Sequence, residues 1–193
     1  MQQGGFDPNK LKVLCNFIDV EKCKKENYTK NDYYCFIGRL SHEKGIKTLI
    51  TAANELPYKL IIIGGGPLET EMRKMASANI EFVGFKQWDK IKEIVGKAKF
   101  SVIPSECFEN NPLSVIEAQC LGTPVLGARI GGIPELIEEG VTGMTFESKN
   151  VEDLKVKIQK MFASTFDYPE IAQKSQEKYN AEKYYNELMK IYQ

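Results

Sequence analysis

Two carboxylates, Glu109 and Glu117, stand on either side of a short polar turn that we expect to open a helix. Between them, Asn111 is a residue type favoured at the N-cap, and Pro112 is the type favoured at the first helical position. The backbone N–H groups that follow would then lie unpaired at the positive end of a helix dipole, where anions bind. Amides that attract an anion, beside acids that accept hydrogen bonds from hydroxyl groups, imply a ligand that carries both phosphate and sugar.

A basic loop, Phe36 to Gly45, is the second chemical feature. It follows a predicted strand and precedes an amphipathic helix, so Arg39 and Lys44 should lie at the ligand-binding edge of a sheet. A guanidinium can bond two phosphate oxygens at once and a lysine adds a compact charge, which suits a diphosphate. The alternative is that both are solvated loop cations. His42, the only histidine, has no visible partner in the sequence and is left without a role.

Glu117 lies in the apolar helical run Leu113–Ala118, where a carboxylate is costly unless donors reach it. A ribose offers two adjacent hydroxyls, and a hydrogen bond to a charged group contributes roughly 1.5–3 kcal/mol. The alternative is a carboxylate on the solvent side of the helix. A glycosidase pair is disfavoured because Glu117 sits beside the expected anion site and forms no evident carboxylate dyad.

Two glycine turns could also approach a ligand. The first, Gly64-Gly65-Gly66-Pro67, follows an isoleucine strand, but GxGxxG would need glycine where Glu69 stands, and no GxxxxGK[ST] occurs. We therefore interpret it as a structural turn. The second, Ile130 to Glu135, is either a tight strand-to-helix connection or a source of further amides for the same cleft.

Short apolar runs alternate with helical patterns along the chain. The expected strands are 11–15, 33–37, 59–63, 81–83, 100–103, 124–127 and 144–147, and helices are expected after most of them, including 151–162 and 181–192. This succession predicts an α/β protein with a Rossmann-like, doubly wound parallel sheet. Ligands then belong at the carboxyl ends of the strands.

Composition bounds the function classes. The 193 residues, 42% of them apolar, suit a single domain over 1–193. Lys plus Arg and Asp plus Glu both total 26, so the formal net charge is zero and gives no overall electrostatic attraction for nucleic acid. Five cysteines without CxxC spacing and one histidine make a zinc site improbable and fit a reducing cytosol. No apolar run reaches the length of a membrane span, so we expect a cytoplasmic protein, with peripheral membrane contact left open.

Taken together, these segments resemble the carboxyl-terminal half of a family 4 (group 1) retaining glycosyltransferase of the GT-B fold. The motifs that carry the resemblance are Gly38-Arg39-Leu40 with Glu43-Lys44-Gly45, the turn at 64–67, Phe82-Val83-Gly84, Pro104-Ser105, Glu109 to Glu117, Gly122-Thr123-Pro124-Val125 and Gly131-Gly132-Ile133-Pro134-Glu135. Each is weak alone, and their order and spacing together are specific.

The resemblance implies a role for each matching residue. Arg39 and Lys44 would clamp the diphosphate of a nucleotide-sugar donor, Glu109 would bond the sugar hydroxyls, and Glu117 would hold the ribose. Further donor contacts are implied at Gly38, at Asn110, Asn111, Pro112, Leu113 and Ser114, and, bordering the base, at Val83, Gly84 and Phe85. No metal or cofactor is expected, because fixed cations and amides can stabilise the departing diphosphate.

The implied reaction transfers the sugar to an acceptor hydroxyl with retention, by same-face attack guided by the leaving phosphate, with Glu109 as a positioning group. The sequence departs from the family at one place: Asn110-Asn111-Pro112 stands where the family commonly has Gly-Phe-Gly. Proline has no backbone N–H, so one donor that could have met the ligand is lost.

The resemblance also implies a missing part. The amino-terminal half, which would bind a glycan or lipid-linked acceptor, is not in this sequence, so we expect weak donor binding and little or no transfer by the chain alone. The aromatic helix within 180–192 should pack on that half. Two alternatives stay open: a GT-B nucleotide-sugar epimerase, whose acid and base groups are not evident here, and a non-catalytic nucleotide-sugar binding module.

Overall fold

A computed structural model describes residues 5, 7 and 11–192, so the outer ends of the predicted 1–193 domain lie outside the described residues. Its centre is a six-stranded parallel sheet in the order β3-β2-β1-β4-β5-β6. The strands are β1 (Tyr33–Ile37), β2 (Lys59–Ile63), β3 (Ile80–Gly84), β4 (Ser101–Ile103), β5 (Val125–Ala128) and β6 (Gly143–Phe146). The predicted doubly wound α/β fold is confirmed.

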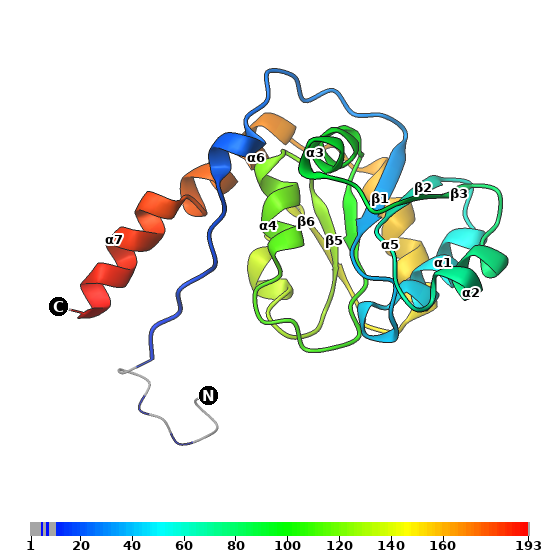
Figure 1. Ribbon diagram of the computed structural model, residues 1–193, viewed down its shortest axis with the longest axis horizontal. Coiled ribbons are helices and arrows are strands. Elements are labelled where there is room, and N and C mark those ends of the chain that lie inside the picture. The colour runs from blue at the N-terminus through cyan, green and yellow to red at the C-terminus, as the bar shows by residue number, and fades with distance from the viewer. Residues whose placement is uncertain (1–4, 6, 8–10, 193) are drawn as a thin grey trace.

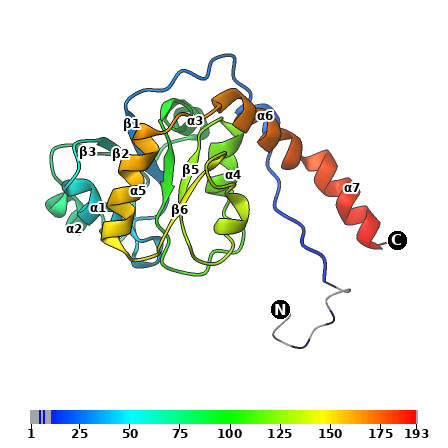
Figure 2. The same ribbon diagram turned by 180° about the vertical axis from the view of Figure 1, so that it is seen from behind.

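Helices cover both faces of this sheet (Figures 1 and 2). They are α1 (Ile46–Asn54), α2 (Glu69–Met75), α3 (Trp88–Lys97), α4 (Leu113–Cys120), α5 (Val151–Ala163), α6 (Tyr168–Lys178) and α7 (Ala181–Tyr192). Helices α3 and α4 lie on one face and α1 and α5 on the other, while α2 packs on α1 and α6 on α4. Six helices therefore enclose the sheet, and α7 projects away from it.

Successive side chains along each strand point to opposite faces of the sheet, and so they contribute to two separate hydrophobic cores. In β1, Tyr34 and Phe36 pack with α1 and α5, whereas Tyr33 and Cys35 pack on the side of α3 and α4. The isoleucines of β2 divide in the same way. Because both faces are covered, these strands read as continuous apolar runs in the sequence.

The predicted strand 11–15 is wrong. This segment has no strand partner and runs as extended chain beside α7 (Figure 1). Cys15, at its end, packs against the core beside α3 and α4. Just after it, the Ile18 N–H donates to the Tyr179 carbonyl at 3.0 Å and the Phe17 ring lies 4.5 Å from that of Tyr184. A short apolar segment can pack its side chains on the core without joining a β-sheet, and its local sequence does not distinguish the two cases.

The strand order reverses between β1 and β4, and the loops that follow these two strands are joined there. The Glu106 N–H donates to the Glu43 carbonyl at 2.8 Å, and Thr48 Oγ1 donates to Glu106 Oε1 at 2.6 Å. Gly45 adopts φ 67°, and a Cβ there would overlap the Pro104 carbonyl oxygen, so only glycine allows this approach. The fold thus sets both loops at the switch point, where ligands of open α/β sheets bind.

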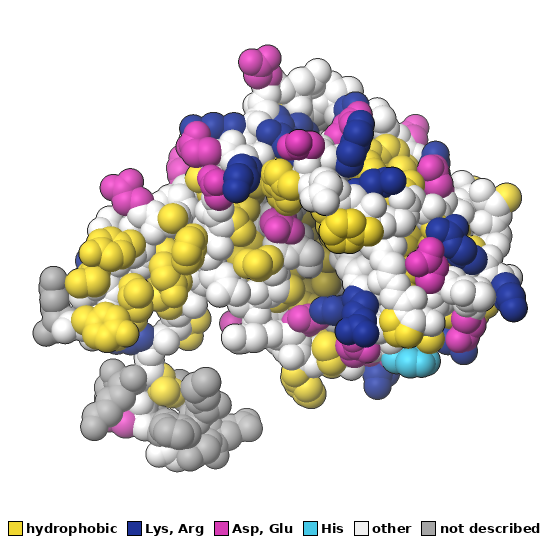
Figure 3. Space-filling view, in the orientation of Figure 1, with side chains coloured by type: hydrophobic (Ala, Val, Ile, Leu, Met, Phe, Trp, Pro, Cys, Tyr) yellow, Lys and Arg dark blue, Asp and Glu magenta, His cyan; other side chains and the backbone are white. Residues whose placement is uncertain are grey.

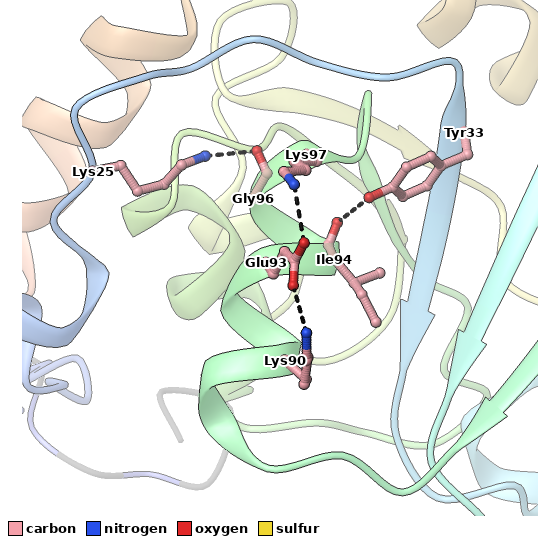
Figure 4. A network of polar contacts seen from close by, with 7 residues as sticks. All are labelled: Lys25, Tyr33, Lys90, Glu93, Ile94, Gly96 and Lys97. Carbon is pink, nitrogen blue, oxygen red and sulfur yellow. Dashed lines mark hydrogen bonds and ion pairs between the residues drawn. The ribbon is translucent and has the colours of Figure 1, made fainter.

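The opposite edge of the sheet is held by the chain that leads into β1. Lys25 Nζ donates to the carbonyl of Gly96, near the end of α3, at 2.7 Å, and Tyr33 Oη donates to the Ile94 carbonyl at 2.7 Å (Figure 4). The connecting segment is therefore fixed to α3. Among the described residues, no helix combines the length and the apolar character needed to cross a membrane.

Candidate functional site

The centre of the site is the carboxylate of Glu109. Lys44 closes a 3-10 helix, His42–Lys44, and its Nζ forms an ion pair and hydrogen bond with Glu109 Oε1. Buried Ser105 donates its hydroxyl to the same oxygen at 3.0 Å, and Cys107 Sγ lies 4.0 Å from it. All of these contacts fall on Oε1, so within residues 11–192 the second oxygen, Oε2, is left free to accept from a ligand hydroxyl.

The second glycine turn supports Glu109 from behind. The Gly132 N–H donates to the Glu109 carbonyl at 2.7 Å. A Cβ on Gly131 would overlap the Glu109 backbone, and one on Gly132 would overlap the carbonyl oxygen of Asn110. Of the two interpretations offered by the sequence, the tight connection describes this turn, because the Gly132 amide is used inside the protein.

Arg39 and Gly38 border a hollow of about 300 Å³ at the carboxyl edge. It is lined by Ile37, Gly38, Arg39, Ile63, Gly64, Gly65, Phe85, Lys86 and Ile91. Gly64 has φ 126°, and a Cβ there would overlap the Gly38 carbonyl oxygen, so the first glycine turn is indeed a structural contact to the basic loop. Arg39 itself is exposed and has no ion pair within the described residues.

The start of α4 differs from the prediction. The helix begins at Leu113, Pro112 occupies the N-cap position, and no side chain caps the amides. Asn111 cannot serve as the cap because its Oδ1 accepts from the Asn16 N–H and its carbonyl accepts from Asn16 Nδ2, both at 2.9 Å. A tertiary contact has thus overridden the local capping preference, and the first amides of α4, at Leu113 and Ser114, have no side-chain cap.

Glu117 lines a different hollow of about 400 Å³ with Phe17, Ile18, Asp19, Lys22, Cys23, Trp88 and Leu113. Burial raises the pKa of the Glu117 carboxyl. Its carboxylate has no hydrogen bond or ion pair within the described part of the chain, although it is half-buried. The sequence argument required a donor for this group, and none of the described residues supplies one.

The predicted site residues therefore divide into three groups. Lys44 and Glu109 are in contact, Gly38, Arg39 and Phe85 share one hollow, and Leu113 and Glu117 share another. Asn111 is used by Asn16, while Asn110 and Ser114 are exposed and half-buried, respectively. At the end of β3, Val83 packs against the core and the Gly84 carbonyl accepts from Gly64 at 3.0 Å, so Phe85 alone of that segment lines the hollow.

Sequence reasoning gave no role to three residues that the structure places here: Ser105, Lys86 and Trp88. Lys86 and Trp88 follow the predicted strand 81–83 directly, so their position after a strand end was a usable signal. No such signal marks the Ser105 contact, which depends on how the loop after β4 folds back. Among the described residues, no group of three or more His, Cys, Asp or Glu side chains could hold a metal ion.

Fold and site define a Rossmann-like domain with a polar site at the switch point of its sheet. Residues 18–183 match the family described as Glycosyl transferases group 1, and the chain belongs to this family. It is 30% identical over 156 residues to an uncharacterized glycosyltransferase of Methanocaldococcus jannaschii, covering 78% of this chain and 43% of that protein. It is 35% identical over 127 residues to a sulfoquinovosyl transferase of Arabidopsis thaliana, covering 63% of this chain and 25% of that protein.

Among solved structures, the fold is similar to that of Anabaena HepE in complex with UDP. The TM-score is 0.84 at 19% identity, and the match covers 98% of this chain and 59% of the HepE chain. The chain thus spans half or less of the length of these two sequence relatives, and little more than half of the structural one.

Proposed function

We propose that this chain is the donor-binding half of a family 4 retaining glycosyltransferase, which binds a nucleoside-diphosphate sugar and, with an amino-terminal half, transfers the sugar to an acceptor hydroxyl. The observation that carries the proposal is the arrangement at the switch point. There Lys44 and Ser105 fix Glu109 through one oxygen, and Arg39, which forms no ion pair with another described residue, stands on the loop that follows β1.

The diphosphate would lie between Arg39 and the start of α4. Two features support this placement. The guanidinium has no ion pair within the described chain, and the amides of Leu113 and Ser114 have no side-chain cap. Charge develops on the diphosphate as the sugar departs, and donors already in place stabilise that charge without reorganising. We expect this stabilisation to need no metal ion.

The two carboxylates would hold the sugar ends of the donor. Glu109 Oε2 is the free acceptor at the centre, where it would bond hydroxyls of the transferred sugar and fix its orientation. Glu117 lies half-buried and receives no hydrogen bond from the described residues, so two ribose hydroxyls would satisfy it and offset the cost of its burial. Glu109 then acts as a positioning group, and attack from the face of the leaving phosphate gives retention.

The rest of the enzyme is also part of the proposal. The chain spans only part of its relatives, so we place acceptor binding, to a glycan or a lipid-linked acceptor, in an amino-terminal half. The isolated chain should bind donor weakly and transfer little or no sugar. We propose a cytoplasmic protein, with any membrane contact made by the full-length enzyme. The HepE complex makes UDP the first nucleotide to test.

Calorimetric titration of the chain with UDP and GDP tests the site. Arg39→Ala and Lys44→Ala should each weaken binding of the preferred nucleotide, on the order of tenfold, because each removes a charged donor. Glu117→Gln should weaken the ribonucleotide more than its 2′-deoxy analogue. The exposed and unassigned His42, changed to Ala, is the matched control.

Unchanged affinity in all three variants, or no binding of either nucleotide, would refute the assignment. Activity is then tested with the full-length parent, labelled nucleotide sugar and an acceptor extract. Label that passes to acceptor supports transfer, whereas interconversion of the free donor would indicate an epimerase and binding alone a non-catalytic module.

A further inference from the structure

We propose that Asn16 is a positioning residue of the donor site. Its hydrogen bonds to Asn111 keep that side chain from capping α4, so the first amides of the helix and the Asn111 side-chain nitrogen stay free to donate to a diphosphate. The inference rests on the proposed function. It adds to the site a residue of the connector, residues 11–32, which leads into β1 and carries none of the donor-site motifs.

Two hydrogen bonds join Asn16 and Asn111 in a closed pair. The Asn16 N–H donates to Asn111 Oδ1, and Asn16 Nδ2 donates to the Asn111 carbonyl, both at 2.9 Å. A backbone N–H can only donate, so the Asn111 side chain must turn its oxygen, and not its nitrogen, to Asn16. Both acceptor atoms of Asn111 then have a donor, while its Nδ2 group donates to no described residue.

This pairing decides which donors are left at the start of α4. An asparagine at a helix start commonly accepts a hydrogen bond from one of the first helix amides. Here Asn16 takes that oxygen, no side chain caps α4, and the amides of Leu113 and Ser114 donate to no described residue. Unpaired amides at the positive end of a helix attract anions. Asn16 therefore keeps available the donors that a capping Asn111 would use.

Pro112 explains why the free nitrogen of Asn111 would matter. Proline has no backbone N–H, so the loop before α4 presents one donor fewer than it otherwise would. The Nδ2 group of Asn111 carries two N–H donors one position earlier in the chain. With the amides of Leu113 and Ser114, it would complete a set of donors for one end of the diphosphate.

The residues that follow the two asparagines lie together in the structure. Phe17, Ile18 and Asp19 of the connector line the hollow of about 400 Å³ that also contains Leu113 and Glu117. The pair thus joins two chain segments that both contribute to this hollow. Because the ribose is proposed to bind at Glu117, the pair stands beside the place where the diphosphate would begin.

Both asparagines lie in backbone that other contacts hold. On the connector, Cys15 packs against the core, and the Ile18 N–H donates to the Tyr179 carbonyl at 3.0 Å. In the loop after β4, the Gly132 N–H donates to the Glu109 carbonyl at 2.7 Å. Loss of one asparagine side chain should therefore leave both segments in place, and its effect should fall on diphosphate binding more than on the fold or the ribose hollow.

The test measures binding of UDP, GDP, uridine and inorganic pyrophosphate to the chain by calorimetry. Asn16→Ala removes the bond to the Asn111 carbonyl and loosens the pair. It should weaken binding of the preferred nucleotide and of pyrophosphate by roughly threefold to tenfold, the range of a neutral hydrogen bond, and leave uridine binding unchanged. The matched control is Asn27→Ala, which removes the acceptor of the Thr29 N–H at 2.7 Å from the same connector.

A second variant tests the free nitrogen directly. Asn111→Asp keeps an acceptor for the Asn16 N–H but replaces the Nδ2 donor by a charged oxygen. Because a carboxylate repels a phosphate, this variant should weaken nucleotide and pyrophosphate binding by more than about tenfold, again with little change for uridine. Diphosphate binding that survives Asn111→Asp unchanged would refute the proposed contact.

The outcomes separate this inference from the proposed function. If UDP or GDP binds and Asn16→Ala changes its affinity no more than Asn27→Ala does, the inference is wrong and the function stands. Equal losses of uridine and nucleotide binding in Asn16→Ala would show a general structural role, and they would also overturn the inference. If neither nucleotide binds but pyrophosphate binds and is weakened in Asn16→Ala, the inference stands and the function is wrong. If no probe binds, both are wrong.

Discussion

At the residue scale, the neighbours Tyr33 and Tyr34 show how one hydrogen bond separates two otherwise similar side chains. Both are buried in β1. The Tyr33 hydroxyl donates to the Ile94 carbonyl at 2.7 Å, which ties β1 to α3 (Figure 4). The Tyr34 hydroxyl points to the other core and has no hydrogen-bond partner among the residues that the structure describes, while its ring lies 5.1 Å from that of Phe100. A buried polar group without a partner costs about 1–3 kcal/mol.

Replacement of each tyrosine by phenylalanine should therefore change stability in opposite directions. Tyr34→Phe removes an unsatisfied hydroxyl and keeps the ring contacts, so the free energy of unfolding should rise by up to about 1 kcal/mol. Tyr33→Phe removes the hydrogen bond that ties β1 to the Ile94 carbonyl, which then keeps, among the described residues, only the Ala98 N–H at 3.1 Å, and should lower the free energy of unfolding by about 1 kcal/mol. Urea unfolding of the two variants beside the wild type gives both values. Equal destabilisation by both changes would contradict the assignment.

At the element scale, half-buried Lys30 joins three elements at the amino edge of the sheet. Its Nζ donates to the Gly96 carbonyl at 3.0 Å and to Thr123 Oγ1 at 2.7 Å, and it lies 4.9 Å from the centre of the Tyr168 ring. It thereby links the connector before β1 to α3, to the start of β5 and to α6. Burial, with the nearby charge of Lys25, lowers the pKa of Lys30 to about 7.

A lysine whose pKa is lower in the folded than in the unfolded state binds fewer protons when folded, so it makes stability rise with pH between the two values. For Lys30 this window opens near pH 7 and extends toward the ordinary lysine value of 10.5. Urea unfolding at several pH values between 6.5 and 9.5 should show a rise in wild-type stability that Lys30→Met flattens. Lys24→Met, at an exposed lysine of the same connector, should keep the rise. An identical slope in Lys30→Met would refute this role, although Lys25, whose pKa is also lowered, contributes in the same direction.

At the scale of the whole molecule, α7 stands apart from the domain and has no buried residue (Figures 1 and 3). Figure 3 shows hydrophobic side chains gathered over this helix. Tyr185, Met189, Ile191 and Tyr192 are among its exposed side chains. We keep the proposal that this face packs on the amino-terminal half of the full-length enzyme, because an exposed apolar surface of this kind marks an interaction site.

An added charge on the apolar face should improve the behaviour of the isolated chain. Tyr185→Lys should raise the concentration at which the chain begins to self-associate, severalfold, as measured by analytical ultracentrifugation. Asn186→Lys adds the same charge at an exposed polar position of the same helix and is the control. A gain of the same size in both variants would show that net charge, and not the apolar face, governs association.

The sequence by itself determined the order and type of most elements and the edge of the sheet at which the candidate site residues lie. Continuous apolar runs such as Leu60–Ile63 predict buried parallel strands, and the spacing of apolar residues in the helix now seen at Ile46–Asn54 predicts its buried face, because both patterns are local properties of the chain. Arg39 and Lys44 could be placed at the carboxyl edge for the same reason, since their position after a strand fixes the edge on which they lie.

Only the tertiary structure decided which of these side chains meet. The ion pair of Lys44 with Glu109 joins loops 65 positions apart, and the bond of Asn16 to Asn111 joins segments 95 positions apart and displaced the expected cap. The segment at 11–15 likewise failed as a strand because its use depends on a partner far along the chain. Local patterns specify the conformation of a segment, whereas pairing across the fold depends on how the whole sheet brings its loops together.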